Sequence, residues 1–314
     1  PSRHLFPFRR QHGASSLLRK PSVAAVAEAH SRLGLGSLAN KGVFVSLLHH
    51  GGEMSTRKHL LGGAVHRAGR LLPERALGVV ENIVQREQGK GWGSGTVAQE
   101  VRACLSLLPS ELGSAPVALD VGANIGNWTA SLLSLAPAAE VVAFEPSSNA
   151  FKQLAERFST ESRVNPVNAG LSNEAGYVSL YADAPGSGLS SFSQRRLNHF
   201  GIEFGFSEQV ETMTADEWCS TNTVRPNILK MDVEGHEMAV LQGALGIVEG
   251  VQVAQFEFGG CNIDSRTFFQ DFFYFFTERG FRLHRLGPRG LIPIERYSER
   301  DEYFSTTNYF AQRT

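Results

Sequence analysis

The chain has 314 residues and a mass of 34.3 kDa, which is enough to bury a sizeable core in one large domain with an extension. Hydrophobic residues make up 42% and charged residues 19%, so the chain is neither a disulfide-rich miniprotein nor disordered throughout. The 30 Lys and Arg residues balance the 31 Asp and Glu residues, and the overall charge therefore gives no reason to expect nucleic acid or an anionic membrane as a partner.

The first 70 residues are locally basic, with Glu28 and Glu53 as their only carboxylates and seven of the ten histidines. An Arg-rich, acid-poor, Ser-containing start resembles an organellar targeting peptide. The simpler interpretation is a partly disordered extension, or sequence ahead of a start at Met54. We predict an extension over 1–95 that turns helical after Pro73, and a main domain over 96–314.

The cysteines and the apolar runs bear on the compartment. Cys104, Cys219 and Cys261 are widely separated and lack CxxC spacing, which favours reduced thiols over a zinc site or a disulfide framework. No uninterrupted apolar run approaches the roughly 20 residues that cross a bilayer. We therefore expect a soluble, cytoplasmic protein with no transmembrane segment, and we predict no resident metal.

Apolar residues recur at helical spacing over 76–83 and 97–108, and from residue 117 onward strands alternate with helices. This alternation is typical of a doubly wound α/β domain with a parallel sheet. Predicted strands cover 117–121, 141–145, 164–169, 177–181, 227–232, 251–258, 281–286 and 308–312. Predicted helices cover 127–135, 150–158 and 268–279, and a further helix buries Leu241, Ala244, Leu245 and Val248. The six phenylalanines between 268 and 276 follow one helical face, which favours core packing over a ligand site.

The segment Asp120-Val-Gly-Ala-Asn-Ile-Gly126 lies where the first strand turns into a helix. Gly122 and Gly126 let the backbone approach a ligand closely, Asn124 tolerates left-handed dihedrals, and the helix start offers oriented N–H groups. The spacing lacks the middle glycine of a dinucleotide fingerprint, which disfavours a dehydrogenase. Glycines also serve ordinary tight turns, so this loop alone is weak evidence.

Glu145 ends the second predicted strand, about 25 residues after Asp120. A carboxylate at that position can accept both hydroxyls of an adenosine ribose. Taken alone, a solvated strand-end carboxylate is the competing interpretation. Together with the glycine loop, Glu145 favours an adenosine-containing ligand.

A third motif runs from Asn227 to Glu237 and is rich in charge. On a strand of period two, Lys230, Asp232 and Glu234 would share one face and converge at the carboxyl end of the sheet, where open α/β sheets bind ligands. Glu257 ends the next strand and adds a carboxylate nearby. A purely structural network of ion pairs is the alternative for this cluster.

These motifs, with Glu145-Pro146 and Leu189-Ser-Ser, resemble the FkbM family of S-adenosylmethionine-dependent methyltransferases over about residues 96–314. Lys230-Met-Asp-Val-Glu-Gly-His-Glu237 is the most specific part of the resemblance. It implies a Rossmann-like class I methyltransferase fold, with a seven-stranded, mostly parallel sheet, helices on both faces and an antiparallel last strand. It also implies S-adenosyl-L-methionine as cofactor, with its methionine end along Gly122 to Gly126, its ribose on Glu145 and its adenine near Asn168 and Ala169. The candidate cofactor-binding residues are Asp120, Gly122, Asn124, Gly126, Glu145, Asn168 and Ala169, and the candidate catalytic residues are Lys230, Asp232, Glu234 and His236.

The function that the resemblance implies is O-methylation of a hydroxyl on a sugar, glycan or polyketide-like metabolite, with Asp232, Glu234 or His236 as base. A non-catalytic module that binds an adenosine ligand is the alternative, and an NAD-dependent oxidoreductase is a weaker one. Asp232, Glu234 and Glu257 offer the oxygen ligands that Mg²⁺ prefers, but nothing in the sequence supports a bound ion. Residues 182–209 are expected to form a lid or acceptor wall, or else a disordered insertion.

Overall fold

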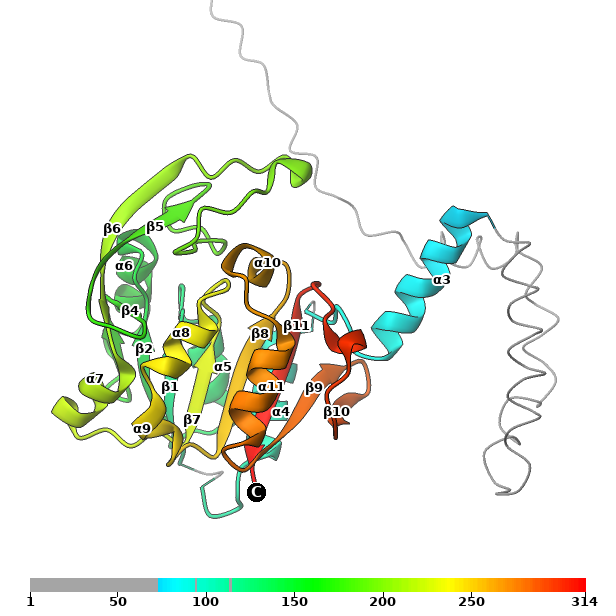
Figure 1. Cartoon of the computed structure of the whole chain (residues 1–314). Coiled ribbons are helices and arrows are strands. Elements are labelled where there is room, and N and C mark those ends of the chain that lie inside the picture. Colours follow the sequence, from blue (N-terminus) through cyan, green and yellow to red (C-terminus); the bar gives the residue numbers. More distant parts are fainter. Residues whose placement is uncertain (1–72, 94, 113–114) are drawn as a thin grey trace, which may run out of the picture. The chain divides into compact units, whose positions relative to one another are not determined.

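A central eight-stranded sheet, with strand order β10-β9-β11-β8-β7-β1-β2-β3, organises the structure (Figure 1). The computed structural model describes residues 73–93, 95–112 and 115–314. The predicted targeting segment, the start at Met54 and the disorder of the basic arm all lie outside the described residues. The described chain forms one compact unit, Pro73–Thr314, and the boundary at residue 95 stays a prediction.

The strands of this sheet are short, and those in its parallel part are mostly apolar. They are β1 Val117–Val121, β2 Glu140–Phe144, β3 Val164–Val167, β7 Ile228–Met231, β8 Val253–Phe258, β9 Phe281–Gly287, β10 Gly290–Ile294 and β11 Thr307–Arg313. The longer helices are α3 Glu74–Glu87, α4 Val97–Ser106, α5 Asn127–Leu135, α6 Ser148–Arg157, α7 Ala215–Asn222, α8 Glu237–Gln242 and α11 Phe269–Thr277. Shorter helical segments are η3 Asn198–Phe200, α9 Leu245–Val248, α10 Cys261–Ser265 and η4 Glu299–Asp301.

The topology confirms the predicted α/β fold class. β1, β2, β3, β7 and β8 pair in parallel, whereas β11 runs antiparallel between β8 and β9, as expected of the last strand. The sheet has one strand more than the seven predicted, because β10 forms a hairpin with β9. Pro293 lies in β10 and weakens its strand pattern, although a proline is tolerated in an edge strand.

A second sheet of three strands, β4-β6-β5, was not predicted as a sheet. Its members are β4 Gly170–Leu171, β5 Gly176–Ala182 and β6 Phe206–Met213, and β5 and β6 are antiparallel. Only the β5 region was predicted to be extended. Five of the eight residues of β6 are polar and they do not alternate regularly with apolar ones, so its sequence shows a weak strand signal.

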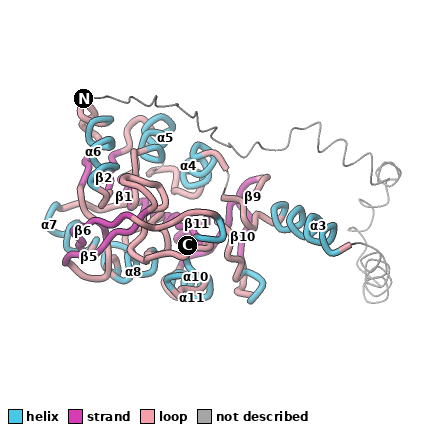
Figure 2. Tube along the Cα trace, turned by 90° about the horizontal axis from the view of Figure 1, so that it is seen from above, coloured by secondary structure: helices cyan, strands magenta, loops and turns pink. Residues whose placement is uncertain are grey.

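Helices cover both faces of the large sheet, as Figure 2 shows in the view from above. Successive strand residues point to opposite faces, so Ala118 and Ala143 contribute to one core while Leu119 and Phe144 contribute to the other. The first core also takes residues from α4, α5 and α6, and the second takes residues from α7, α8, α9 and α11. Within the described ranges, no helix combines the length and apolar character needed to span a bilayer.

The phenylalanines of α11 lie in the core, as predicted. Phe272 and Phe276 are fully buried, and both rings stack on Phe256 of β8, with centroids 4.8 and 5.4 Å away. The predicted burial of Leu245 is wrong, because its side chain is 46% exposed. The expected single helix breaks into α8 and α9 around Gly243, where a Cβ would lie 2.0 Å from the Ser172 carbonyl oxygen.

Gly126 provides a test of why a glycine is needed before α5. Its φ is 78°, and an added Cβ would lie 2.4 Å from a ring carbon of Phe158. We expect Gly126→Ala to lower the free energy of unfolding by about 2 to 4 kcal/mol, through backbone strain and overpacking. Urea denaturation measures this change in the free energy of unfolding. Gly176→Ala is the matched control, because a Cβ there meets nothing within 4 Å; equal losses in the two variants would show that the packing argument is wrong.

Candidate active site

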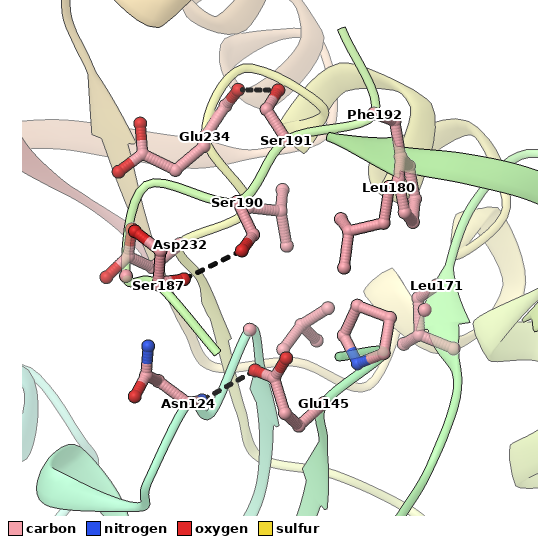
Figure 3. A pocket seen from close by; sticks show the side chains of 16 residues that line it. Asn124, Glu145, Leu171, Leu180, Ser187, Ser190, Ser191, Phe192, Asp232 and Glu234 are labelled. Carbon is pink, nitrogen blue, oxygen red and sulfur yellow. Dashed lines mark hydrogen bonds between the residues drawn. The ribbon is translucent and has the colours of Figure 1, made fainter. Parts of the chain in front are cut away.

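A pocket opens at the carboxyl edge of the large sheet, where β1, β2 and β7 end (Figure 3). The loop between β5 and β6 forms its opposite wall. The pocket is lined by Val121, Gly122, Asn124, Glu145, Pro146, Gly170, Leu171, Leu180, Ser187, Gly188, Ser190, Ser191, Phe192, Asp232, Val233 and Glu234. Three of the predicted cofactor-binding residues, Gly122, Asn124 and Glu145, and two of the predicted catalytic residues, Asp232 and Glu234, are therefore brought together.

The loop after β1 approaches the backbone that follows β7 so closely that only glycine fits at the first turn of the loop. Gly122 has a φ of 74°, and a Cβ there would lie 1.9 Å from the Asp232 carbonyl oxygen. Asn124 is also left-handed, with a φ of 49°, and its side-chain oxygen accepts a hydrogen bond from the Ile125 N–H at 2.7 Å. This conformation leaves Gly122 and Asn124 facing the pocket.

Glu145 binds the glycine loop from the end of β2. Its Oε2 accepts a hydrogen bond from the Asn124 N–H, and its Oε1 accepts one from the Ser147 N–H, both at 2.8 Å. The residue is 6% exposed, and burial raises its pKa to about 7. Each carboxylate oxygen can accept more than one hydrogen bond, so Glu145 supports the loop and still presents acceptors to the pocket.

The other four candidate cofactor residues do not line the pocket. Asp120 is fully buried below it, and Gly126 packs against Leu154 and Phe158. The Asn168 side chain donates to the backbone oxygens of Glu145 and Pro146, and Ala169 is buried. The next two residues, Gly170 and Leu171, reach the pocket instead. A cofactor role for Asp120, Gly126, Asn168 or Ala169 stays a prediction.

Lys230 lies beneath the glycine loop and makes a buried ion pair. Its Nζ is 2.9 Å from Asp120 Oδ1 and donates to the Gly122 carbonyl oxygen at 2.9 Å, while Thr129 Oγ1 donates to Asp120 Oδ2 at 2.6 Å. Burial alone would lower the pKa of Lys230, but Asp120 and Asp232 outweigh it and raise that pKa. Lys230 therefore joins β1 to β7 and does not line the pocket.

The prediction that Lys230, Asp232 and Glu234 share one strand face is wrong, because β7 ends at Met231. Asp232 follows the strand and lines the pocket with its side chain 47% exposed. Glu234 is left-handed, with a φ of 52°, and its carboxylate pairs with Arg195 at 2.5 Å. Burial and the Asp232 charge raise the pKa of Glu234 to about 7, against the opposing effect of Arg195.

Glu257 lies next to Glu234 at the end of β8. Burial, followed by repulsion from Asp232 and Glu234, holds the pKa of Glu257 well above its ordinary value. Single ligand atoms of Glu234, Glu257 and Cys261 lie within 4.8 Å of one another, whereas Asp232, which offers a further oxygen ligand in the sequence, is not among them. Arg195 already neutralises Glu234 here, so these groups give no independent support for an ion.

His236 stands apart from the pocket lining. It is half-buried immediately before α8, its Nε2 is 2.9 Å from Ser172 Oγ, and its ring meets Phe192 edge-on. Burial lowers its pKa to about 4, so the imidazole is neutral at physiological pH. This position allows His236 to support Phe192 at the pocket wall, and a role as base stays a prediction.

Part of the opposite wall was expected from the sequence, because the pocket residues from Ser187 to Phe192 lie in the segment 182–209 that was expected to form a lid or acceptor wall. The lining roles of Gly170, Leu171 and Leu180 were missed, because they depend on the second sheet, which was not predicted. Arg195 carries no local signal either, because its partners are 39 and 69 residues away. Its importance follows only from the folded loop.

A family model, described as the methyltransferase FkbM domain, matches residues 120–283. The chain belongs to this family. Hexuronic acid methyltransferase AglP of Haloferax volcanii is 31% identical over 149 residues, which cover 47% of this chain and 57% of the relative. The 2-O-methyltransferase NoeI of Sinorhizobium fredii is 29% identical over 138 residues, which cover 41% and 57%. The chain thus spans little more than half the length of these curated relatives.

Solved structures resemble this FkbM domain only remotely. A precorrin-6y C5,15-methyltransferase from Geobacter metallireducens gives a TM-score of 0.37 at 10% identity and covers 68% of this chain and 87% of its own. A TehB-like SAM-dependent methyltransferase from Corynebacterium glutamicum gives a TM-score of 0.37 at 13% identity, with coverages of 74% and 97%.

The buried ion pair makes a stability prediction. Lys230→Met leaves Asp120, which is 0% exposed, without a cation. We expect the free energy of unfolding to fall by about 3 to 5 kcal/mol, as for other broken buried pairs. Denaturant unfolding checks this. The double variant Lys230→Met with Asp120→Asn should recover much of the loss, and a single variant as stable as wild type would contradict the electrostatic role.

Glu145 makes a prediction about pH. An ionised carboxylate accepts hydroxyl hydrogen bonds, and protonation below its pKa of about 7 removes acceptors. Affinity for S-adenosylhomocysteine should therefore fall as pH drops below about 7, by at most about tenfold per pH unit. Calorimetric titrations between about pH 6 and 8 measure this.

In this titration, Glu145→Gln is the matched variant. It should bind more weakly by about 1 to 3 kcal/mol above neutrality, the range for hydrogen bonds to charged groups, and its affinity should change less with pH. If the affinities of wild type and Glu145→Gln change with pH in the same way, the titrating group is not Glu145.

Proposed function

We propose that this FkbM domain transfers a methyl group from S-adenosyl-L-methionine to a hydroxyl of a sugar, glycan or polyketide-like metabolite. The observation that carries the proposal is the pocket at the carboxyl edge of the sheet. It brings the Glu145 carboxylate, the glycine loop after β1 and the Asp232 carboxylate into one lining. The relatives AglP and NoeI, whose names describe methylation of a hexuronic acid and 2-O-methylation, support sugar hydroxyls as acceptors.

The residues present fit the cofactor that the family implies. Gly122 lines the pocket without a side chain, and the buried Glu145 keeps free acceptor capacity toward the pocket. In this proposal Glu145 holds the ribose hydroxyls and the loop from Gly122 to Asn124 contacts the methionine end. When bound, the cofactor supplies an electrophilic methyl group, and the chain has mainly to align an acceptor hydroxyl with it.

Asp232 is the favoured group for the acceptor hydroxyl. It lines the pocket, and its side chain is 47% exposed, so it can receive a proton from an incoming hydroxyl. Glu234 also lines the pocket, but its carboxylate is engaged by Arg195. Lys230 contributes indirectly in this scheme, because its ion pair and its hydrogen bond to Gly122 hold the loop in place.

The partner and compartment are parts of the same proposal. The pocket suits a small hydroxylated acceptor or the end of a glycan, and the balanced charge of the chain gives no basis for nucleic acid as the substrate. Cys104, Cys219 and Cys261 are all free and buried, which fits a reducing compartment such as the cytoplasm.

The test is turnover with labelled S-adenosylmethionine and a panel of sugars, glycolipids and hydroxylated metabolites, with mass analysis of the products. Asp232→Asn should retain affinity for S-adenosylhomocysteine, because Asp232 is not assigned to the ribose or adenine. Turnover should fall by about 10² to 10⁴ if Asp232 is the base. Binding without turnover on any acceptor would favour the non-catalytic adenosine module instead.

Two further variants assign the base. Glu234→Gln should lower turnover less than Asp232→Asn, and His236→Ala should leave it near the wild-type rate, since His236 does not line the pocket. A large loss only in His236→Ala would move the role to histidine. Chelator treatment belongs in the same assay. If a chelator abolishes turnover and Mg²⁺ restores it, Asp232 and Glu234 would be identified as metal ligands.

A further inference from the structure

The loop from 183 to 205 joins β5 to β6 and carries one wall of the pocket. In Figure 3 this wall, with Ser187, Ser190, Ser191 and Phe192, faces Asn124 and Glu145 across the pocket. The loop contains only the short η3 turn as regular structure. Its position therefore depends on particular contacts between side chains and backbone.

Contacts of Ser191 and of Phe192 hold the centre of this wall. Ser191 and Tyr181 exchange backbone hydrogen bonds at 2.9 Å in both directions, which anchors the loop to β5. The Ser191 hydroxyl also donates to the Glu234 carbonyl oxygen at 2.8 Å (Figure 3). The Phe192 ring meets the His236 ring edge-on. Phe192 also lies against Gly170, where an added Cβ would be 2.6 Å from the Phe192 ring.

Arg195 makes a further connection, through two ion pairs. Its Nη1 donates to Glu234 Oε2 at 2.5 Å, and its Nε donates to Asp264 Oδ2 at 3.4 Å. Its side chain is 9% exposed. One guanidinium therefore ties the β5–β6 loop to the turn after β7 and to α10.

The partner of Arg195 is held in an unfavourable backbone conformation. Glu234 has a φ of 52°, and a non-glycine residue in this region stores strain unless its surroundings hold it. The Ser191 hydroxyl binds the backbone oxygen of Glu234, and Arg195 binds its carboxylate. Asp232, which also lines the pocket, is only two residues away along the chain.

We propose that Arg195 is a positioning residue that acts through Glu234, fixing the turn that carries Asp232 and closing the loop wall over the pocket. The proposal rests on the methyltransferase function given above and deepens it. Arg195 is not placed against donor or acceptor, so its effect passes through the geometry of the wall. The proposal predicts that loss of the Arg195 guanidinium loosens the loop and weakens donor binding under conditions in which the domain is still folded.

The first experiment measures the loop directly, without any ligand. Hydrogen exchange, followed by mass spectrometry, should show that Arg195→Met speeds exchange in peptides covering 187–194 by at least about tenfold, because a buried ion pair is lost there. Peptides from β1 and β7 should keep wild-type exchange. Unchanged exchange over 187–194 would overturn the proposal.

The second experiment separates positioning from bulk stability. Arg195→Met should weaken binding of S-adenosylhomocysteine, measured by calorimetry, by about tenfold or more, and Arg195→Lys should recover part of it, because lysine keeps the charge but not the forked donors. Arg163→Met is the matched control. Arg163 also pairs with a glutamate at 2.5 Å, Glu161, but immediately before β3, away from the pocket lining.

A double-variant cycle tests the route through Glu234. If Arg195 acts through that carboxylate, Arg195→Met and Glu234→Gln should be strongly non-additive in their effect on donor affinity. Additive effects, or equal losses in Arg195→Met and Arg163→Met, would reduce Arg195 to a general stabilising residue. Failure of the wild-type protein to bind S-adenosylhomocysteine would instead remove the proposed function, while the hydrogen-exchange result still decides the role of Arg195 in the loop.

Discussion

The buried ion pair between Lys230 and Asp120 is the interaction on which the site depends. It joins the ends of two neighbouring parallel strands, and the same ammonium donates to the Gly122 carbonyl oxygen. Gly122 in turn lies so close to the Asp232 backbone that no side chain fits between them. One charge pair therefore sets the spacing of two segments that line the pocket, the loop after β1 and the turn after β7.

A second constraint is the crowding of acidic groups at this edge. Glu100, Glu234 and Glu257 have raised pKa values, with burial as the first cause and repulsion from Asp232 as the second. Lys230 and Arg195 are the cations paired with acids of this edge among the described residues. Arg195 pairs with Glu234 and Asp264, whereas Asp232 lines the pocket with its side chain 47% exposed.

Much of the fold follows from local patterns. The apolar strands and the helices after them appear near their predicted positions, because buried parallel strands need continuous apolar runs and their crossovers need amphipathic helices. Weak patterns were missed: β10 contains Pro293, and β6 is largely polar. Leu245 followed the helical pattern and is nevertheless exposed, because Gly243 packs on the Ser172 backbone and breaks the helix before it.

The sequence by itself determined the family, the fold class and the residues that face each other where β1, β2 and β7 end, because strand ends in a parallel sheet must share one edge. Only the tertiary structure decided what each residue does at that edge. It placed Asp120 and Lys230 beneath the pocket, turned His236 toward Ser172, and brought Gly126 close to Phe158. It also brought Arg195 to Glu234 across 39 residues of chain. These roles depend on contacts between distant segments, and no local pattern of residue types encodes such contacts.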